Sequence, residues 1–271
     1  MNYPFSYVAP RSKDELHDLL AEKGDRAEVF SGGTDLFVNL RYGFLQPDYV
    51  VDLKGVKDLH ELSYDPNEGL RIGACVTVNK LLDSREVEKH YRILHVAAGE
   101  LATHQLRNRA TVVGNLVTAS PCGDMASPLL CVEASVVLSS KRGTRELPVK
   151  EFITGVKQTA IASDEIVEAV KVPAATADMT GGYEKLKRIK GHDLGLVAVA
   201  MARKNGSMRF AISSAAPTPV LLPDFDADTP YEKVEAAAME AIKPIDDVRC
   251  TADYRRFMVG QYIKRLMEEV A

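Results

Sequence analysis

The sequence predicts an α+β protein, and three observations support this. Helix-like and strand-like segments alternate, but most strands are joined by short turns rather than by long helical crossovers. The chain has 271 residues, 46% of them hydrophobic, which is enough for one large domain or two modest ones with a real core. A stretch of small residues at 174–182 interrupts the pattern. We therefore expect a domain boundary there, with domains at 1–175 and 176–271.

The N-terminal segment predicts a helix that is well marked at its start. Ser12 and Glu15 form a capping box, in which each side chain can accept a hydrogen bond from a free amide of the first turn. Leu16, Leu19 and Leu20 then form an apolar stripe. The same reasoning predicts strands at 28–31 and 49–53, and a helix that begins at Leu36.

The middle of the chain contains a hairpin signal at 62–74, with residues 65–69 as its turn. Apolar periodicity predicts helices from Thr77 to Leu82 and from Ile93 to Leu106. Further strands are expected at 135–138 and 166–172.

The C-terminal part predicts a small antiparallel sheet with two helices packed on it. Residues 194–203 and 208–214 form a hairpin pattern around a turn at 204–206. The first helix is expected to have Thr229 as cap, Pro230 at its first position and Glu232 at its third. The second helix is expected to pack through one face, formed by Tyr254, Phe257, Met258 and Tyr262.

Composition excludes several classes of protein. The 34 Lys and Arg residues nearly balance 38 acidic ones, so the excess cationic charge of a nucleic-acid or anionic-membrane binder is missing. No apolar run approaches the roughly 20 residues of a membrane span, and no secretory signal is visible. The four cysteines lack the spacing of a zinc or iron–sulfur site, so we expect reduced thiols, no metal ligands and a cytoplasmic protein.

A glycine-containing turn, Ser31-Gly32-Gly33-Thr34-Asp35, stands between a predicted strand and a predicted helix. Adjacent glycines allow successive amides to point into one concavity, where they can bind an anion, and Thr34 adds a hydroxyl donor. The alternative is an ordinary strand-to-helix turn in which Thr34 or Asp35 caps the helix. The turn alone does not decide between these two interpretations.

A second polar segment runs from Thr111 through Gly114, Asn115 and Thr118 to Asp124. Hydroxyls and backbone amides suit a phosphate, and the carboxylate of Asp124 can accept hydrogen bonds from sugar hydroxyls. An ordinary loop with Asx-turns is the alternative. The chain has no G-x-G-x-x-G, P-loop, G-x-S-x-G or H-E-x-x-H motif, so the common dinucleotide, nucleotide, hydrolase and zinc-protease sites are not indicated.

Taken in order, these segments resemble the FAD-binding subunits of the molybdenum hydroxylases, which include the xanthine dehydrogenase and aerobic carbon monoxide dehydrogenase families. The similarity covers nearly the whole chain, and the ordered set of motifs is highly specific. The segments that carry it are 31–36, 104–115, 118–124, 129–138, 151–155, 165–173, 183–187 and 215–219.

The resemblance implies an FAD-binding domain of the vanillyl-alcohol-oxidase/PCMH type. This domain has two α+β subdomains, at about 1–56 and 57–175, and a carbon monoxide dehydrogenase flavoprotein-like C-terminal domain follows. FAD would lie between the subdomains with its pyrophosphate held by Ser31–Asp35 and Thr111–Asn115. The implied contacts to the rest of FAD are Thr118 and Asp124 near the ribityl and ribose groups, Ile166 behind the flavin, Lys185 reaching it from the C-terminal domain, and Tyr183 as a weaker candidate for shielding the ring.

The resemblance also implies a function. A molybdopterin-binding large subunit would hydroxylate the substrate, and a small subunit would pass electrons through [2Fe–2S] clusters to FAD and then to NAD+ or another acceptor. The chain itself would supply no general acid or base. The second turn departs from the family in one respect, because Val113 stands where the family usually has glycine, and its Cβ restricts approach of the backbone.

Two other functions remain open. One is a stand-alone FAD-dependent NAD(P)H oxidoreductase. The other is a flavin-free scaffold subunit, for which Val113 is the only support in the sequence.

Overall fold

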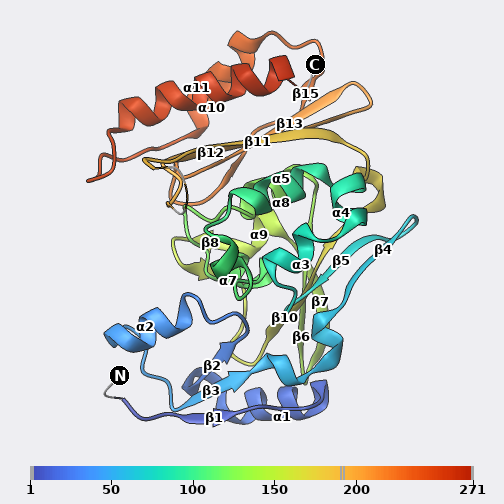
Figure 1. The fold of residues 1–271 in the computed structure, drawn as a ribbon, viewed down its shortest axis with the longest axis vertical. Coiled ribbons are helices and arrows are strands. Elements are labelled where there is room, and N and C mark those ends of the chain that lie inside the picture. The colour runs from blue at the N-terminus through green and yellow to red at the C-terminus, as the bar shows by residue number, and fades with distance from the viewer. Residues whose placement is uncertain (1–2, 190, 192, 270–271) are drawn as a thin grey trace.

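Three main sheets follow one another along the long axis of the molecule (Figure 1). They are seen in a computed structural model that describes residues 3–189, 191 and 193–269. Mixed helices and sheets agree with the predicted α+β class, although the first sheet is entirely parallel. None of the helices in these ranges is long and apolar enough to cross a membrane.

The N-terminal sheet has the order β1-β3-β2. Its strands are β1 (Ser6–Val8), β2 (Ala27–Phe30) and β3 (Tyr49–Asp52), and the connecting helices are α1 (Lys13–Lys23) and α2 (Leu36–Tyr42). The strands are parallel because a helix separates each from the next. The Ser12 hydroxyl accepts from the Glu15 amide at 3.2 Å as expected, but the Glu15 carboxylate accepts from the amide of Arg11 instead of Ser12.

The central sheet is antiparallel, in the order β4-β5-β10-β6-β7. Its strands are β4 (Leu62–Asp65), β5 (Gly69–Gly73), β6 (Ser135–Ser140), β7 (Gly143–Pro148) and β10 (Ile166–Val172), and a separate small hairpin pairs β8 (Ile153–Gly155) with β9 (Gln158–Thr159). The helices around it are α3 (Val78–Leu82), α4 (Arg85–His90), α5 (Arg92–Glu100), α6 (His104–Arg107), α7 (Val112–Val117), α8 (Ala126–Cys131) and α9 (Val149–Phe152).

The single helix predicted for 93–106 is in fact two, α5 and α6. The chain turns between them at Ala102, which has a φ of 46°, and Thr103 caps the new helix by accepting from the Leu106 amide. The apolar periodicity continues across this break, so it gave no sign of the turn. The break matters because Leu101 and Ala102 line the cavity described below.

The C-terminal sheet lies between two helical layers (Figure 1). Its strands are β11 (Thr180–Leu186), β12 (Val197–Lys204), β13 (Ser207–Ser213), β14 (Val220–Leu221) and β15 (Phe225–Asp226), followed by α10 (Tyr231–Ala241) and α11 (Ala252–Glu269). Along β12 the side chains alternate: Ala198 and Ala200 pack in the central core with α5 and α8, while Val199 and Met201 pack under α10 and α11.

Two expectations about the C-terminal helices were wrong. Pro230 is the N-cap of α10 rather than its first residue, because the Thr229 amide closes the preceding turn on the Asp226 carbonyl at 2.9 Å. On α11, Tyr262 is buried, but Tyr254 and Phe257 are 45% and 59% exposed. The inward face is shifted because the Arg255 guanidinium is buried and donates to the carbonyls of Leu196 and Ser214, and the other buried residues of the helix are Val259, Gly260, Tyr262, Ile263 and Leu266.

Candidate functional site

A cavity of about 930 Å³ lies where the N-terminal part, the central part and the β11–β12 loop meet. Most of the residues predicted for the site line it. Those lining residues are Ser31, Gly32, Gly33, Thr34, Asp35, Thr111, Gly114, Asn115, Thr118, Asp124 and Ile166. The two exceptions are Lys185 and the weaker candidate Tyr183, which do not line the cavity and instead contact Asp124. The turns at 31–35 and 111–115, some eighty positions apart in sequence, therefore share one space.

The first turn leads from β2 into α2 and presents free amides. Gly33 has a φ of 77°, a conformation that suits glycine, and none of the amides of 32–35 donates to another backbone group within the described residues. Consecutive unpaired amides around a left-handed residue are the arrangement that binds anions. The Ser31 hydroxyl is used otherwise, because it donates to the Ala74 carbonyl at 2.9 Å and fastens the turn to the end of β5.

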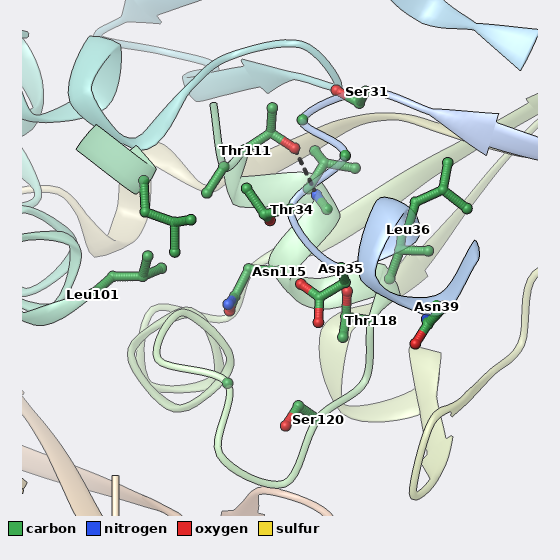
Figure 2. A pocket seen from close by; sticks show the side chains of 18 of the residues that line it. Ser31, Thr34, Asp35, Leu36, Asn39, Leu101, Thr111, Asn115, Thr118 and Ser120 are labelled. Atoms are coloured by element: carbon green, nitrogen blue, oxygen red, sulfur yellow. Dashed lines mark hydrogen bonds between the residues drawn. The ribbon is translucent and has the colours of Figure 1, made fainter. Parts of the chain in front are cut away.

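The second turn is the start of α7. Thr111 is the N-cap, and its hydroxyl accepts from the Gly114 amide at 3.0 Å, so this amide is already engaged. The Asn115 side chain accepts from the Met125 amide at 3.1 Å, which holds the loop of residues 120–125 against α7. Figure 2 shows Thr34, Asp35, Asn115 and Thr118 gathered in the space between the two turns.

The two turns are in direct backbone contact. A Cβ added to Gly32 would overlap the carbonyl oxygen of Arg109, just before the second turn. Any larger residue at position 32 would therefore force the turns apart. This close approach explains why glycine is needed here, and it means that a ligand in the cavity meets both turns at once.

Two residues of β11, Lys185 and Tyr183, contact the carboxylate of Asp124. The Lys185 ammonium lies 2.8 and 2.9 Å from the two carboxylate oxygens, and the Tyr183 hydroxyl donates to the carboxylate at 2.9 Å. Burial raises the pKa of Asp124, and Lys185 and Tyr183 oppose that shift. Burial together with the neighbouring carboxylate also holds the pKa of Tyr183 well above its usual range. The side chain of Lys185 is 1% exposed, so it supports Asp124 instead of entering the cavity.

Sequence reasoning missed most of the apolar wall and the rim. Leu53, Leu101 and Leu106 line the cavity although they come from distant segments. The β11–β12 loop adds Arg188, which pairs with Asp193 at 2.8 Å. No local motif marks such residues, because only the folded chain brings them together.

The cap of α7 can be tested separately from its effect on ligand binding. We expect Thr111→Ala to cost about 1 kcal/mol of stability, because the Gly114 amide loses its acceptor. Ser84→Ala removes a similar cap from α4, outside the cavity. Both variants should lower the denaturation midpoint, but only Thr111→Ala should also weaken FAD binding, measured by flavin fluorescence titration. Equal FAD affinity in the two variants would contradict a role for this turn.

Two turns of this kind around one cavity are typical of a protein that binds a phosphate-bearing cofactor. The comparisons identify the family: a model described as the FAD binding domain in molybdopterin dehydrogenase matches residues 3–175. The chain belongs to this family, it binds FAD, and it is an oxidoreductase subunit. The resemblance noted in the sequence is thereby confirmed.

The similarity to individual relatives extends over the whole chain. The carbon monoxide dehydrogenase medium chain of Hydrogenophaga pseudoflava is 31% identical and is aligned over 97% of this chain and 96% of its own length. The xanthine dehydrogenase FAD-binding subunit of Escherichia coli O157:H7 is 26% identical, over 97% and 95%.

Solved structures show the same fold. A chain of the Hydrogenophaga pseudoflava carbon monoxide dehydrogenase matches with a TM-score of 0.89 and 30% identity, over 99% of this chain and 98% of that one. A chain of the reconstituted enzyme from Oligotropha carboxidovorans matches with a TM-score of 0.91 and 27% identity, over the same shares.

Proposed function

We propose that this chain is the FAD-binding electron-transfer subunit of a molybdopterin-dependent hydroxylase or dehydrogenase. It would receive electrons from the [2Fe–2S] clusters of a small partner subunit and pass them through FAD to NAD+ or another acceptor. A molybdopterin-binding large subunit would carry out the chemistry on the substrate. The observation that carries the proposal is the single cavity lined by both turns, in a chain that aligns end to end with subunits of this kind.

We assign the cofactor contacts as follows. The free amides of the first turn and the start of α7 hold the pyrophosphate, which suits their donor character. Thr118 and Asp124 face the sugar and ribityl hydroxyls, and Ile166 backs the flavin. Lys185 acts through Asp124, because their ion pair is buried. Val113 lines the cavity and is 4% exposed, so its backbone lies at the site despite its side chain.

The division of labour follows from this assignment. Bound FAD supplies the redox chemistry, while the residues of this chain bind it, orient it and control access to it. We assign no general acid or base. We also propose the division into domains at 1–175 and 176–271, and a cytoplasmic location. The four cysteines are free, which suits a reducing compartment.

The electron route can be tested on the native complex. We expect the chain to co-purify with two other subunits together with molybdenum and iron, and stopped-flow absorbance to show flavin reduction after iron–sulfur reduction when substrate is added. The isolated chain with FAD and NADH should turn over an artificial acceptor poorly, because in the proposed complex FAD is reduced by the [2Fe–2S] subunit and NADH is not its physiological donor. Rapid NADH turnover by the isolated chain, without partners, would instead support a stand-alone NAD(P)H oxidoreductase.

A further inference from the structure

The cavity contains one half-buried carboxylate that has no partner among the described residues. Asp124 is paired with Lys185, Glu165 with Arg145, and Asp193 with Arg188. Asp35 is exposed to water. Glu28 lines the cavity from β2 and is only partly exposed, yet no cation of the described chain pairs with it.

Burial raises the pKa of the Glu28 carboxyl, and no charged neighbour opposes that shift. Taking a carboxylate out of water without a hydrogen-bond donor is unfavourable. A ligand group that donates a hydrogen bond would relieve this cost. The feature therefore indicates a donor on the bound cofactor at this place.

The position of Glu28 indicates which part of the cofactor it meets. β2 runs directly into the first turn, and an extended strand rises about 3.3 Å per residue, so Glu28 lies roughly 13 Å from Gly32 along the chain. The C-terminal sheet and the N-terminal sheet lie at opposite ends of the molecule (Figure 1), and residues of the β11–β12 loop and of β2 line the same cavity. The proposed placement has Asp124, which contacts β11 of the C-terminal sheet, facing the ribityl and sugar hydroxyls. The redox ring then lies toward that sheet, which leaves the Glu28 end for the base.

The surroundings of Glu28 suit a flat base. Leu53 directly follows β3, the strand that pairs with β2, and its buried apolar side chain lines the same cavity. Adenine has an exocyclic amine that donates hydrogen bonds, whereas the one donor at the polar edge of the flavin ring, N3–H, stands between two carbonyls. An unpaired carboxylate matches the amine and repels a carbonyl.

We propose that Glu28 is a specificity residue of the FAD site, whose carboxylate accepts a hydrogen bond from the exocyclic amine of adenine. This inference rests on the proposed placement of FAD and goes beyond it, because it assigns a base-recognition role to a residue outside both turns. It requires that the chain distinguish adenine from a base that has a carbonyl in place of the amine.

The test compares two ligands on the full-length chain after its flavin has been removed. The ligands are FAD and its deaminated analogue, in which hypoxanthine replaces adenine, and binding is followed by flavin fluorescence. We expect the wild type to prefer FAD by about tenfold, the difference of one hydrogen bond to a charged group. Glu28→Gln should bind both ligands almost equally, because an amide can accept from the amine or donate to the carbonyl. Glu28→Ala should also lose the preference.

Glu68→Gln, in the exposed turn between β4 and β5, is the matched control and should keep the wild-type preference. Circular dichroism establishes that each variant is folded. If Glu28→Gln keeps the wild-type ratio, or if the wild type shows no preference, the inference is wrong while the FAD site stands. If the wild type binds neither ligand, the proposed FAD placement fails and the inference fails with it.

Discussion

Gly33→Val should purify almost without flavin. Gly33 has a φ of 77°, and a Cβ there would lie 2.5 Å from the Phe30 ring and 2.8 Å from the Phe37 ring. The turn would have to change its backbone, and its amides would no longer converge on one anion. Loss of two hydrogen bonds to a charged phosphate weakens binding by about 100-fold or more. The measurement is the ratio of flavin to protein absorbance in the purified chain, followed by titration with FAD.

The control for this variant is Gly43→Val. Gly43 caps α2 with a φ of 75°, so valine there meets nearly the same backbone strain, but the nearest atom to an added Cβ is 3.7 Å away and Gly43 is outside the cavity. Both variants should lose some stability, and only Gly33→Val should lose FAD. Wild-type FAD content in Gly33→Val would show that the pyrophosphate is held elsewhere.

Lys185→Met is expected to cost about 3–5 kcal/mol of unfolding free energy near neutral pH. The substitution leaves Asp124 buried with a hydrogen bond from Tyr183 but without its cation. Urea unfolding of the flavin-free chain measures the loss without a contribution from ligand binding. Asp124→Asn combined with Lys185→Met should recover a large part of it, because neither charge then remains buried.

The same variant should show a distinctive pH dependence. Removing Lys185 removes the main influence that lowers the pKa of Asp124, so burial raises this pKa further above its unfolded value. A carboxyl with a raised pKa in the folded state disfavours folding as the pH rises through that range. The stability difference between Lys185→Met and the wild type should therefore be largest near about pH 8 and smaller near about pH 5. A pH-independent difference would mean that lost packing, not lost charge pairing, causes the effect.

Residues that act through local backbone geometry could be predicted from the sequence. The glycines of the first turn are required by the conformation of their own segment, and the positive φ of Gly33 agrees with the expected turn. Thr111 was expected in the site, but its role as the N-cap of α7 was not predicted. Lys185 was expected to reach the flavin, but the sequence does not show that its buried ammonium pairs with Asp124. Glu28 was missed because it has no motif, and its environment depends on β3 and β10.

The same distinction holds for the fold. The β4–β5 and β12–β13 hairpins were predicted from their turn residues, and both are present. The break between α5 and α6 at Ala102 was not predicted, and neither was the face of α11 that is buried. Long-range packing determines both features. In α11 the decisive contacts are those of the buried Arg255 with the carbonyls of Leu196 and Ser214, which lie far away in the sequence.

The alternation of side chains along β12 has a consequence for how the protein can be divided. Ala198, Ala200 and Ala202 belong to the same core as the central sheet, and their small size lets the backbone of β12 lie close to α8. A fragment that began at residue 176 would expose this surface to water, and a fragment ending at 175 would expose its counterpart. The two parts are therefore not modules that evolution or an engineer can exchange freely, and a transplanted FAD-binding region would need this alanine-lined strand to accompany it.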